Sequence, residues 1–112
     1  MKKKNILKKN EDFNRIITKI KPYRYKYLSF YVERTTTDTY FFGFSVGKKI
    51  GTAVKRNKIK RQLKEIISKN NYQNGFNCII MVNRGIISKN FIEIKNDVNN
   101  SLKNLNILKW WR

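Results

Sequence analysis

Eight positively charged side chains are concentrated in one stretch of this chain that contains no acidic residue. The stretch lies between Asp38 and Glu65. Its charged residues are Lys48, Lys49, Lys55, Arg56, Lys58, Lys60, Arg61 and Lys64. Ammonium and guanidinium groups gathered without carboxylates attract an anion that carries several charges, such as a row of phosphates. The pattern therefore indicates a binding surface for a polyanion.

Two of these residues, Arg56 and Arg61, belong to a segment whose spacing predicts a helix. Lysine outnumbers arginine in the chain by 19 to 7. The presence of two arginines here therefore indicates that the planar guanidinium is required, because it can bind phosphate through two hydrogen bonds. On a helical wheel, Asn57, Arg61 and Lys64 fall opposite the apolar stripe, Lys60 lies at the border, and Arg56 lies outside that face. The alternative is a solvated helix face with arginines placed by chance.

The start of this helix carries cations where they are unfavourable. Thr52 is suited to cap the helix, which places Lys55 and Arg56 in its first turn. Each cation there costs a few tenths to about 1 kcal/mol, because the helix dipole is positive at that end. The arrangement makes sense where free amides and basic side chains converge on phosphate oxygens.

Aromatic and basic residues alternate in residues 23–27, which read Tyr-Arg-Tyr-Lys-Tyr. Tyr31 continues the face that includes Tyr27 and points away from Phe30. Such a face can stack on unpaired bases. Tyrosine is also common in half-buried strands, so a packing role is an equal alternative.

Residues for acid–base or metal catalysis are scarce. The sequence has no histidine, no pair of cysteines and no glycine-rich phosphate loop. The adjacent acids Glu11 and Asp12 fit the start of a helix, and Cys78 lies in an apolar run typical of a buried strand. If RNA is cut where this chain binds, we expect the chain to supply neither the acid, the base nor the nucleophile.

The composition limits the class of protein. A chain of 112 residues can close about one hydrophobic core, so residues 1–112 are expected to form one domain. The net charge of +19, with 40% hydrophobic residues, predicts a folded protein that binds a nucleic acid. No apolar run is long enough to span a membrane and no secretory signal is recognised, which predicts a cytoplasmic protein. A basic membrane-surface module is a remoter alternative.

Periodicity predicts six elements that must position these residues. The expected helices cover residues 11–21, residues 52–70 and a segment capped by Ser88. The expected strands cover residues 23–32, 39–46 and 76–82. The first two strands are expected to form a hairpin, and the third, a nearly continuous apolar run, is typical of a strand buried on both faces. The order α-β-β-α-β-α predicts an α/β (α+β) sandwich of helices on a small sheet.

The segment from Phe42 to Arg61, FGFSVGKKIGTAVKRNKIKR, resembles the signature of the bacterial ribonuclease P protein family. Its core is similar to that family's RNR helix motif, which maps to Arg56, Asn57, Lys60 and Arg61. The opening LKKNEDF, residues 7–13, resembles the family's first helix, and the order of elements agrees to the end of the chain. The resemblance therefore spans nearly all of the sequence.

This resemblance implies a fold like the second domain of a small-subunit ribosomal protein and the fourth domain of elongation factor G, with a left-handed crossover between parallel strands. It implies a subunit of an enzyme that removes the 5′ leader from precursor tRNA. The partner RNA is catalytic and holds the Mg²⁺, and the protein alone is inactive. No membrane or protein partner is expected. The implied RNA-binding residues are Lys48, Lys49, Lys55, Arg56, Asn57, Lys60, Arg61 and Lys64. The implied leader cleft contains Phe13, Ile17, Tyr27 and Tyr31.

Two positions depart from the family pattern. Lys64 stands where the motif usually has arginine, which keeps the charge and loses the planar fork. Ile17 stands where an aromatic residue is common, which leaves an apolar contact in place of stacking. The alternative function is a ribosomal or other structural RNA-binding protein with the same fold, which needs the charge but no leader cleft.

Overall fold

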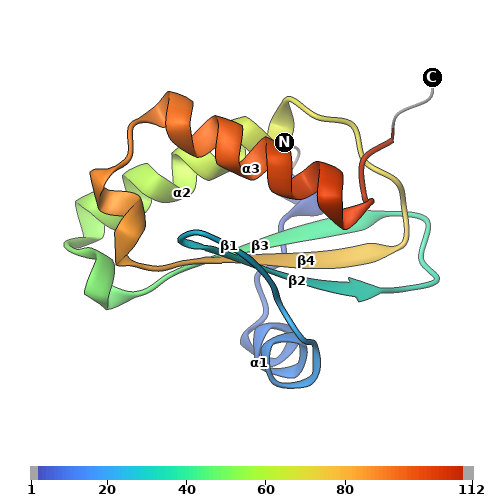
Figure 1. Cartoon of the computed structure of the whole chain (residues 1–112). Helices are drawn as coiled ribbons and strands as arrows, with labels where there is room; N and C mark the ends of the chain where they lie inside the picture. The colour runs from blue at the N-terminus through green and yellow to red at the C-terminus, as the bar shows by residue number, and fades with distance from the viewer. Residues whose placement is uncertain (1–2, 110–112) are drawn as a thin grey trace.

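The computed structural model describes residues 3–109, in which a four-stranded sheet carries helices on both faces. Helices α2 and α3 lie on one face and α1 lies on the other (Figure 1). The helices are α1 (Asn10–Lys19), α2 (Ala53–Ser68) and α3 (Phe91–Leu105). The strands are β1 (Tyr23–Tyr25), β2 (Leu28–Arg34), β3 (Tyr40–Val46) and β4 (Phe76–Val82). This arrangement confirms the predicted α/β (α+β) sandwich.

Strand β4 lies inside the sheet, whose order is β1-β2-β4-β3. Ile79 of β4 is opposite Tyr31 of antiparallel β2 and opposite Gly43 of parallel β3. The predicted hairpin between β2 and β3 is therefore wrong. The physical reason is that β4 is apolar on both faces, so a position between two neighbours and two helix layers suits it best.

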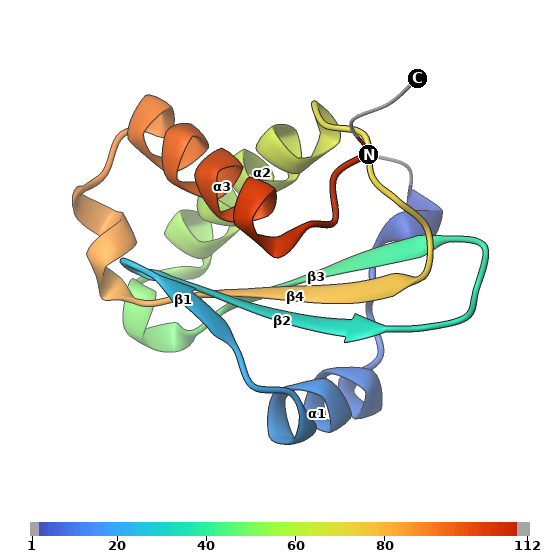
Figure 2. The ribbon, with the colours of Figure 1, turned by 45° about the vertical axis from the view of Figure 1, so that its right-hand side comes forward.

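Helix α2 connects the parallel strands β3 and β4 and packs on the same sheet face as α3 (Figure 2). This crossover agrees with the fold that the resemblance implies. Its left-handed sense stays a prediction. In the strand order of this sheet, β3 is an edge strand. Helix α1 from one face and α2 from the other can therefore both lie beside its free edge.

A tight turn divides the predicted strand over residues 23–32 into β1 and β2. Tyr25 pairs with Leu28 across this turn, and Lys26 adopts a left-handed backbone with φ of 55°. Such a conformation is uncommon for lysine and persists where surrounding contacts compensate for it. Here Lys26 Nζ lies 3.2 Å from the carboxylate of Asp97 on α3.

The larger core lies between the sheet and helices α2 and α3. Its centre is a cluster of the rings of Phe42, Tyr72 and Phe76, whose centroids are 4.8 to 6.3 Å apart. The apolar stripe predicted for α2 is buried in it, and so is Cys78. Burial raises the pKa of the Cys78 thiol, in agreement with the small apolar role predicted for it.

A smaller core lies between α1 and the opposite sheet face. Ile16 of α1, Tyr31 of β2 and Ile79 of β4 are buried there. Phe13 and Ile17 pack against this cluster and remain partly exposed. The face of α1 that carries Ile16 therefore packs on the sheet, while Phe13 and Ile17 remain partly accessible to solvent.

The helix ends differ in part from the predictions. Thr52 caps α2 as predicted, since its hydroxyl oxygen accepts a hydrogen bond from the backbone N–H of Lys55. Ser88 does not cap α3, because it belongs to a 3-10 helix (Arg84–Ser88) that precedes the cap. The cap is Asn90, which exchanges reciprocal hydrogen bonds with Glu93.

Candidate nucleic-acid interface

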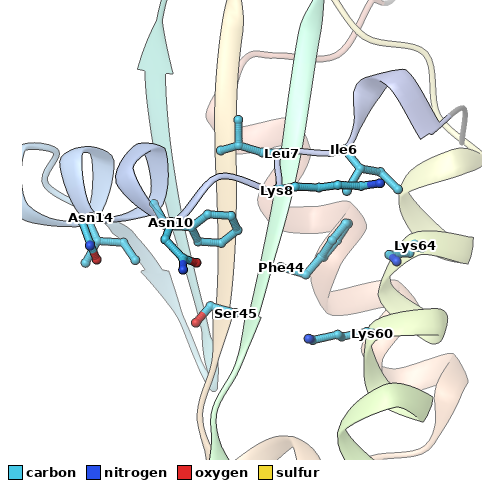
Figure 3. Close-up of a pocket in the computed structure, with 11 residues that line it drawn as sticks. Ile6, Leu7, Lys8, Asn10, Asn14, Phe44, Ser45, Lys60 and Lys64 are labelled. Carbon is cyan, nitrogen blue, oxygen red and sulfur yellow. The ribbon is translucent and has the colours of Figure 1, made fainter.

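An open groove of about 690 Å³ runs along the free edge of β3, between α1 and α2. Figure 3 shows Asn10 and Asn14 on the α1 side, Phe44 and Ser45 on β3, and Lys60 and Lys64 on α2. The lining residues are Ile6, Leu7, Lys8, Asn10, Phe13, Asn14, Ile17, Phe44, Ser45, Lys60 and Lys64. The groove therefore has an apolar wall on α1 and a cationic wall on α2.

The segment before α1 closes one end of this groove by pairing with the edge of β3. The backbone N–H of Leu7 donates to the carbonyl oxygen of Phe42 at 2.7 Å. Asn5 is buried, and its side-chain amide donates to the Tyr40 carbonyl oxygen at 2.8 Å and lies 3.2 Å from the Thr39 hydroxyl. These bonds hold the segment that carries Lys8, which lines the groove together with Lys60 and Lys64 of α2 (Figure 3).

The ring of Phe13 lies directly on the backbone of β3 at Gly43. A Cβ atom at Gly43 would stand 2.6 Å from Cζ of Phe13, closer than packed carbon atoms approach each other. Glycine at this position therefore allows the tip of the Phe13 ring to approach the strand this closely. The contact places Phe13 in the apolar wall of the groove.

A cluster of charged groups fixes α1 on the sheet. Arg15 donates two hydrogen bonds to Glu33 of β2, at 2.8 and 3.2 Å, and a third to Asp12 at 2.8 Å. Asn77 of β4 donates to the same Glu33 carboxylate at 3.0 Å. The hydrogen bonds from Arg15 are the main reason that the pKa of Glu33 is lowered from its ordinary value. Two of the seven acids of the chain are thus used to orient one helix.

The predicted polyanion-binding residues of α2 point in three directions. Lys60 and Lys64 are half-buried and line the groove. Asn57 and Arg61 are exposed on the outer face, as the helical wheel predicts. Lys55 lies on the opposite flank of α2, away from the groove.

Arg56 behaves differently from the other basic residues of α2. It is only partly exposed, and its Nε atom is buried without a hydrogen-bond partner among residues 3–109. A buried donor without a partner is costly. The helical wheel placed Arg56 outside the outer face, which agrees with this partial burial.

Lys48 and Lys49 are exposed in a short 3-10 helix (Lys48–Ile50) that directly follows β3. Gly51 ends this helix with φ of 148°, a backbone conformation that strongly favours glycine. The two lysines lie beyond Ser45, at the end of β3 opposite the N-terminal segment. They extend the positive surface along the line of the groove.

The two tyrosines predicted for the leader cleft lie elsewhere. Tyr27 is a buried residue of the larger core, on the α3 side of the sheet, and its hydroxyl donates to Asp97 at 2.8 Å. The turn at Lys26 directs the side chain of Tyr27 to the α3 side of the sheet. The prediction that Tyr27 lines the leader cleft is therefore wrong. Tyr31 packs beneath α1 near Phe13 and Ile17, but it is buried and does not line the groove.

Sequence reasoning missed seven residues that line the groove: Ile6, Leu7, Lys8, Asn10, Asn14, Phe44 and Ser45. Asn14 is one turn before the predicted cleft residue Ile17 on an amphipathic helix, a signal that could have identified it. Phe44 and Ser45 depend on β3 being an edge strand, which the sequence did not predict. Between residues 3 and 109 no cluster of metal-ligating side chains and no helix able to cross a membrane is found.

The fold and the groove together define a small, basic α+β protein with a cationic helix beside an edge strand. The ribonuclease P family profile matches residues 1–106. The chain is 33% identical over 99 residues to the ribonuclease P protein component of Mycoplasma mobile, covering 88% of this chain and 87% of that protein. It is 35% identical over 114 residues to the component from Listeria monocytogenes, covering 97% and 94%. The chain belongs to the ribonuclease P protein family.

Solved structures agree with this assignment. The Staphylococcus aureus RNase P protein superposes with a TM-score of 0.84 at 29% identity, covering 94% of this chain and 98% of that one. The Thermotoga maritima RNase P protein superposes with a TM-score of 0.79 at 25% identity, covering 88% and 94%. The similarity therefore includes the elements that form both walls of the groove.

Proposed function

We propose that this chain is the protein subunit of ribonuclease P, that it binds the catalytic RNA through α2, and that it holds the 5′ leader of precursor tRNA in the groove. The observation that carries the proposal is the groove itself, in a member of this family. The apolar side chains of α1 line one side of the groove, and the ammonium groups of α2 line the other. The edge strand β3 lies between them. An unpaired strand needs these two features, since its bases pack on apolar side chains and its phosphates require cations.

The RNA-facing part of the proposal assigns the outer face of α2 to the catalytic RNA. Asn57 and Arg61 are exposed there, and α2 has no acid in its first turn. Arg61 can bind a phosphate through two parallel hydrogen bonds, while Lys48 and Lys49 supply point charges. The remaining predicted contacts, Lys55 and Arg56, lie near the positive end of the α2 dipole, where a phosphate is stabilised.

The leader-facing part assigns the groove to the single-stranded nucleotides upstream of the cleavage site. Phe13 and Ile17 supply the apolar wall, and Lys60 and Lys64 supply the cations. The side chains of Asn10 and Asn14 can donate hydrogen bonds to base edges or to phosphates. Mature tRNA lacks these nucleotides, so the groove is expected to distinguish precursor from product.

The Mg²⁺ of the reaction is assigned to the RNA partner, where it would activate water and stabilise the leaving oxygen. No carboxylate lines the groove among residues 3–109, and Asp12 and Glu33 on the sheet side of α1 already accept hydrogen bonds from Arg15. The role of the protein is then to raise the affinity of the complex for the precursor. At limiting Mg²⁺ this contribution is expected to be largest.

Reconstitution tests this proposal. The protein alone should cleave no precursor tRNA, and the cognate RNA with the protein should cleave faster at low Mg²⁺ than the RNA alone. A ribosomal or other structural RNA-binding role predicts a different outcome: the protein would copurify with ribosomal particles and leave the rate of leader removal unchanged.

A further inference from the structure

A second, smaller groove lies on the other flank of α2, between this helix and the segment that leads into α3. Its volume is about 210 Å³. The floor of this groove consists of buried isoleucines, among them Ile59, Ile86 and Ile94. Neither the proposed leader groove nor the outer face of α2 includes this surface.

The rim of this groove is cationic. Lys55 and Lys58 of α2 stand on one side and Lys89 stands on the other. No carboxylate lines it among the described residues, and Glu93 reaches Lys89 only at 4.0 Å. A ligand that fits this groove needs an apolar surface that packs on the isoleucines and negative charges that reach the three ammonium groups at the rim.

An exposed isoleucine lies in this groove. Ile87 is 47% exposed and lines the groove above the buried isoleucines. Gln62 of α2 also lines it and offers both a donor and an acceptor. An apolar side chain at the surface beside an amide group can pack on a ring while the amide bonds its edge.

We propose that this groove receives a single unpaired base of the catalytic RNA. The base lies against Ile87 with its edge toward Gln62, and the flanking phosphates lie on Lys55, Lys58 and Lys89. The volume suits one planar ring, whereas a peptide helix needs a groove long enough for anchors over two turns. The site also adjoins the RNA contacts proposed at the start of α2, because Lys55 is one of those contacts and lines this groove. The inference therefore rests on the proposed function.

A matched pair of variants tests the base site. Ile87→Ser should weaken binding of the cognate ribonuclease P RNA at least about fivefold at fixed salt, because an apolar base contact is lost. Ile92→Ser is the control, since Ile92 is also exposed, at 67%, but does not line the groove. Its affinity should equal that of the unchanged protein. The salt dependence of binding should be unaltered in both variants, because neither removes a charge.

Crosslinking identifies the occupant. Ile87→Cys allows a photoreactive label to be attached at this position, because Cys78 is fully buried and should not react. The label should map to one unpaired nucleotide of the RNA. Labelling spread over paired regions, or wild-type affinity of Ile87→Ser without any RNA crosslink, would overturn the base site.

A third variant separates this inference from the proposed function. Arg61→Gln removes a charge from the outer face of α2, so it should weaken RNA binding even if the base site is wrong. Loss of affinity in Arg61→Gln but not in Ile87→Ser overturns only the base site. Unchanged affinity in both variants overturns the RNA-facing part of the proposed function as well.

Discussion

Gly43 is the residue whose replacement tests the apolar wall most simply. An alanine there would place its Cβ against the ring of Phe13 and displace the ring from the strand. We expect Gly43→Ala to weaken precursor tRNA binding by about fivefold, corresponding to a cost of about 1 kcal/mol, while mature tRNA binding is kept.

Gly47→Ala is the control for this substitution, because a Cβ atom at Gly47 meets nothing within 4 Å. Replacing Phe13 with leucine in the Gly43→Ala protein should remove the collision and restore part of the affinity. Equal affinities for the Gly43→Ala and Gly47→Ala proteins would show that the position of the Phe13 ring does not matter.

The arginines of α2 allow charge to be separated from geometry. Arg56→Lys and Arg61→Lys keep the charge and lose the planar fork, which should cost about 1–2 kcal/mol, or roughly 5- to 30-fold, in RNA binding or in activity at limiting Mg²⁺. Lys58→Arg keeps the positive charge at an exposed position where only a point charge is proposed to contact phosphate, so it should change little. Identical activities of the three variants at limiting Mg²⁺ would contradict this ranking.

At the scale of elements, Arg15 fixes the position of α1 and hence the width of the groove. Arg15→Met removes all three hydrogen bonds to Glu33 and Asp12 while keeping most of the aliphatic volume. We expect the ratio of precursor to mature tRNA affinity to fall, because α1 would no longer hold Phe13 and Ile17 in place. Lys19→Met is the matched control: it removes one charge from the same helix, near enough to act on the Glu33 carboxylate, but it breaks none of the three hydrogen bonds from Arg15.

The same cluster predicts a pH dependence of stability. The pKa of Glu33 is lowered in the folded protein from its ordinary value of 4.5. A lowered carboxylate pKa stabilises the fold at pH values above the ordinary one, and this contribution is lost as the pH falls through the folded value. The difference in unfolding free energy between the unchanged protein and Arg15→Met should therefore be full at pH 7 and shrink below about pH 4.5. Urea denaturation at the two pH values measures it, and a constant difference would contradict the role of Glu33.

Local patterns predicted the elements better than they predicted the order of the strands. The helix of residues 53–68 and the strand of residues 76–82 follow from apolar spacing and from the Thr52 cap, which are properties of neighbouring residues. The strand order depends on which neighbours suit a largely apolar β4, and that question involves residues far apart in the sequence. Phe44 and Ser45 line the groove because β3 is an edge strand. No sequence pattern indicated that position of β3. Tyr27 was misplaced for a local reason, the left-handed turn at Lys26.

For the molecule as a whole, the net charge of +19 predicts binding that weakens steeply with salt. Seven basic side chains are proposed to contact the catalytic RNA: Lys48, Lys49, Lys55, Arg56, Lys58, Arg61 and Lys89. Binding through six to ten phosphate contacts falls roughly 10³- to 10⁵-fold between 50 and 200 mM salt. Measuring the affinity for the cognate RNA across this range tests the electrostatic account. An affinity that stays constant with salt would contradict it.

The central claim is that the groove beside β3 holds the leader, and two isoleucines of the α1 region test it most directly. Ile17 lines the groove, whereas Ile20 packs against the same small core without lining it. The measurement is the affinity of the reconstituted complex for precursor and for mature tRNA with each residue changed to alanine. We expect Ile17→Ala to weaken precursor binding several-fold while mature tRNA binding is kept, and Ile20→Ala to leave the ratio of the two affinities unchanged. An equal loss for precursor and mature tRNA in Ile17→Ala would contradict the claim and make Ile17 a packing residue.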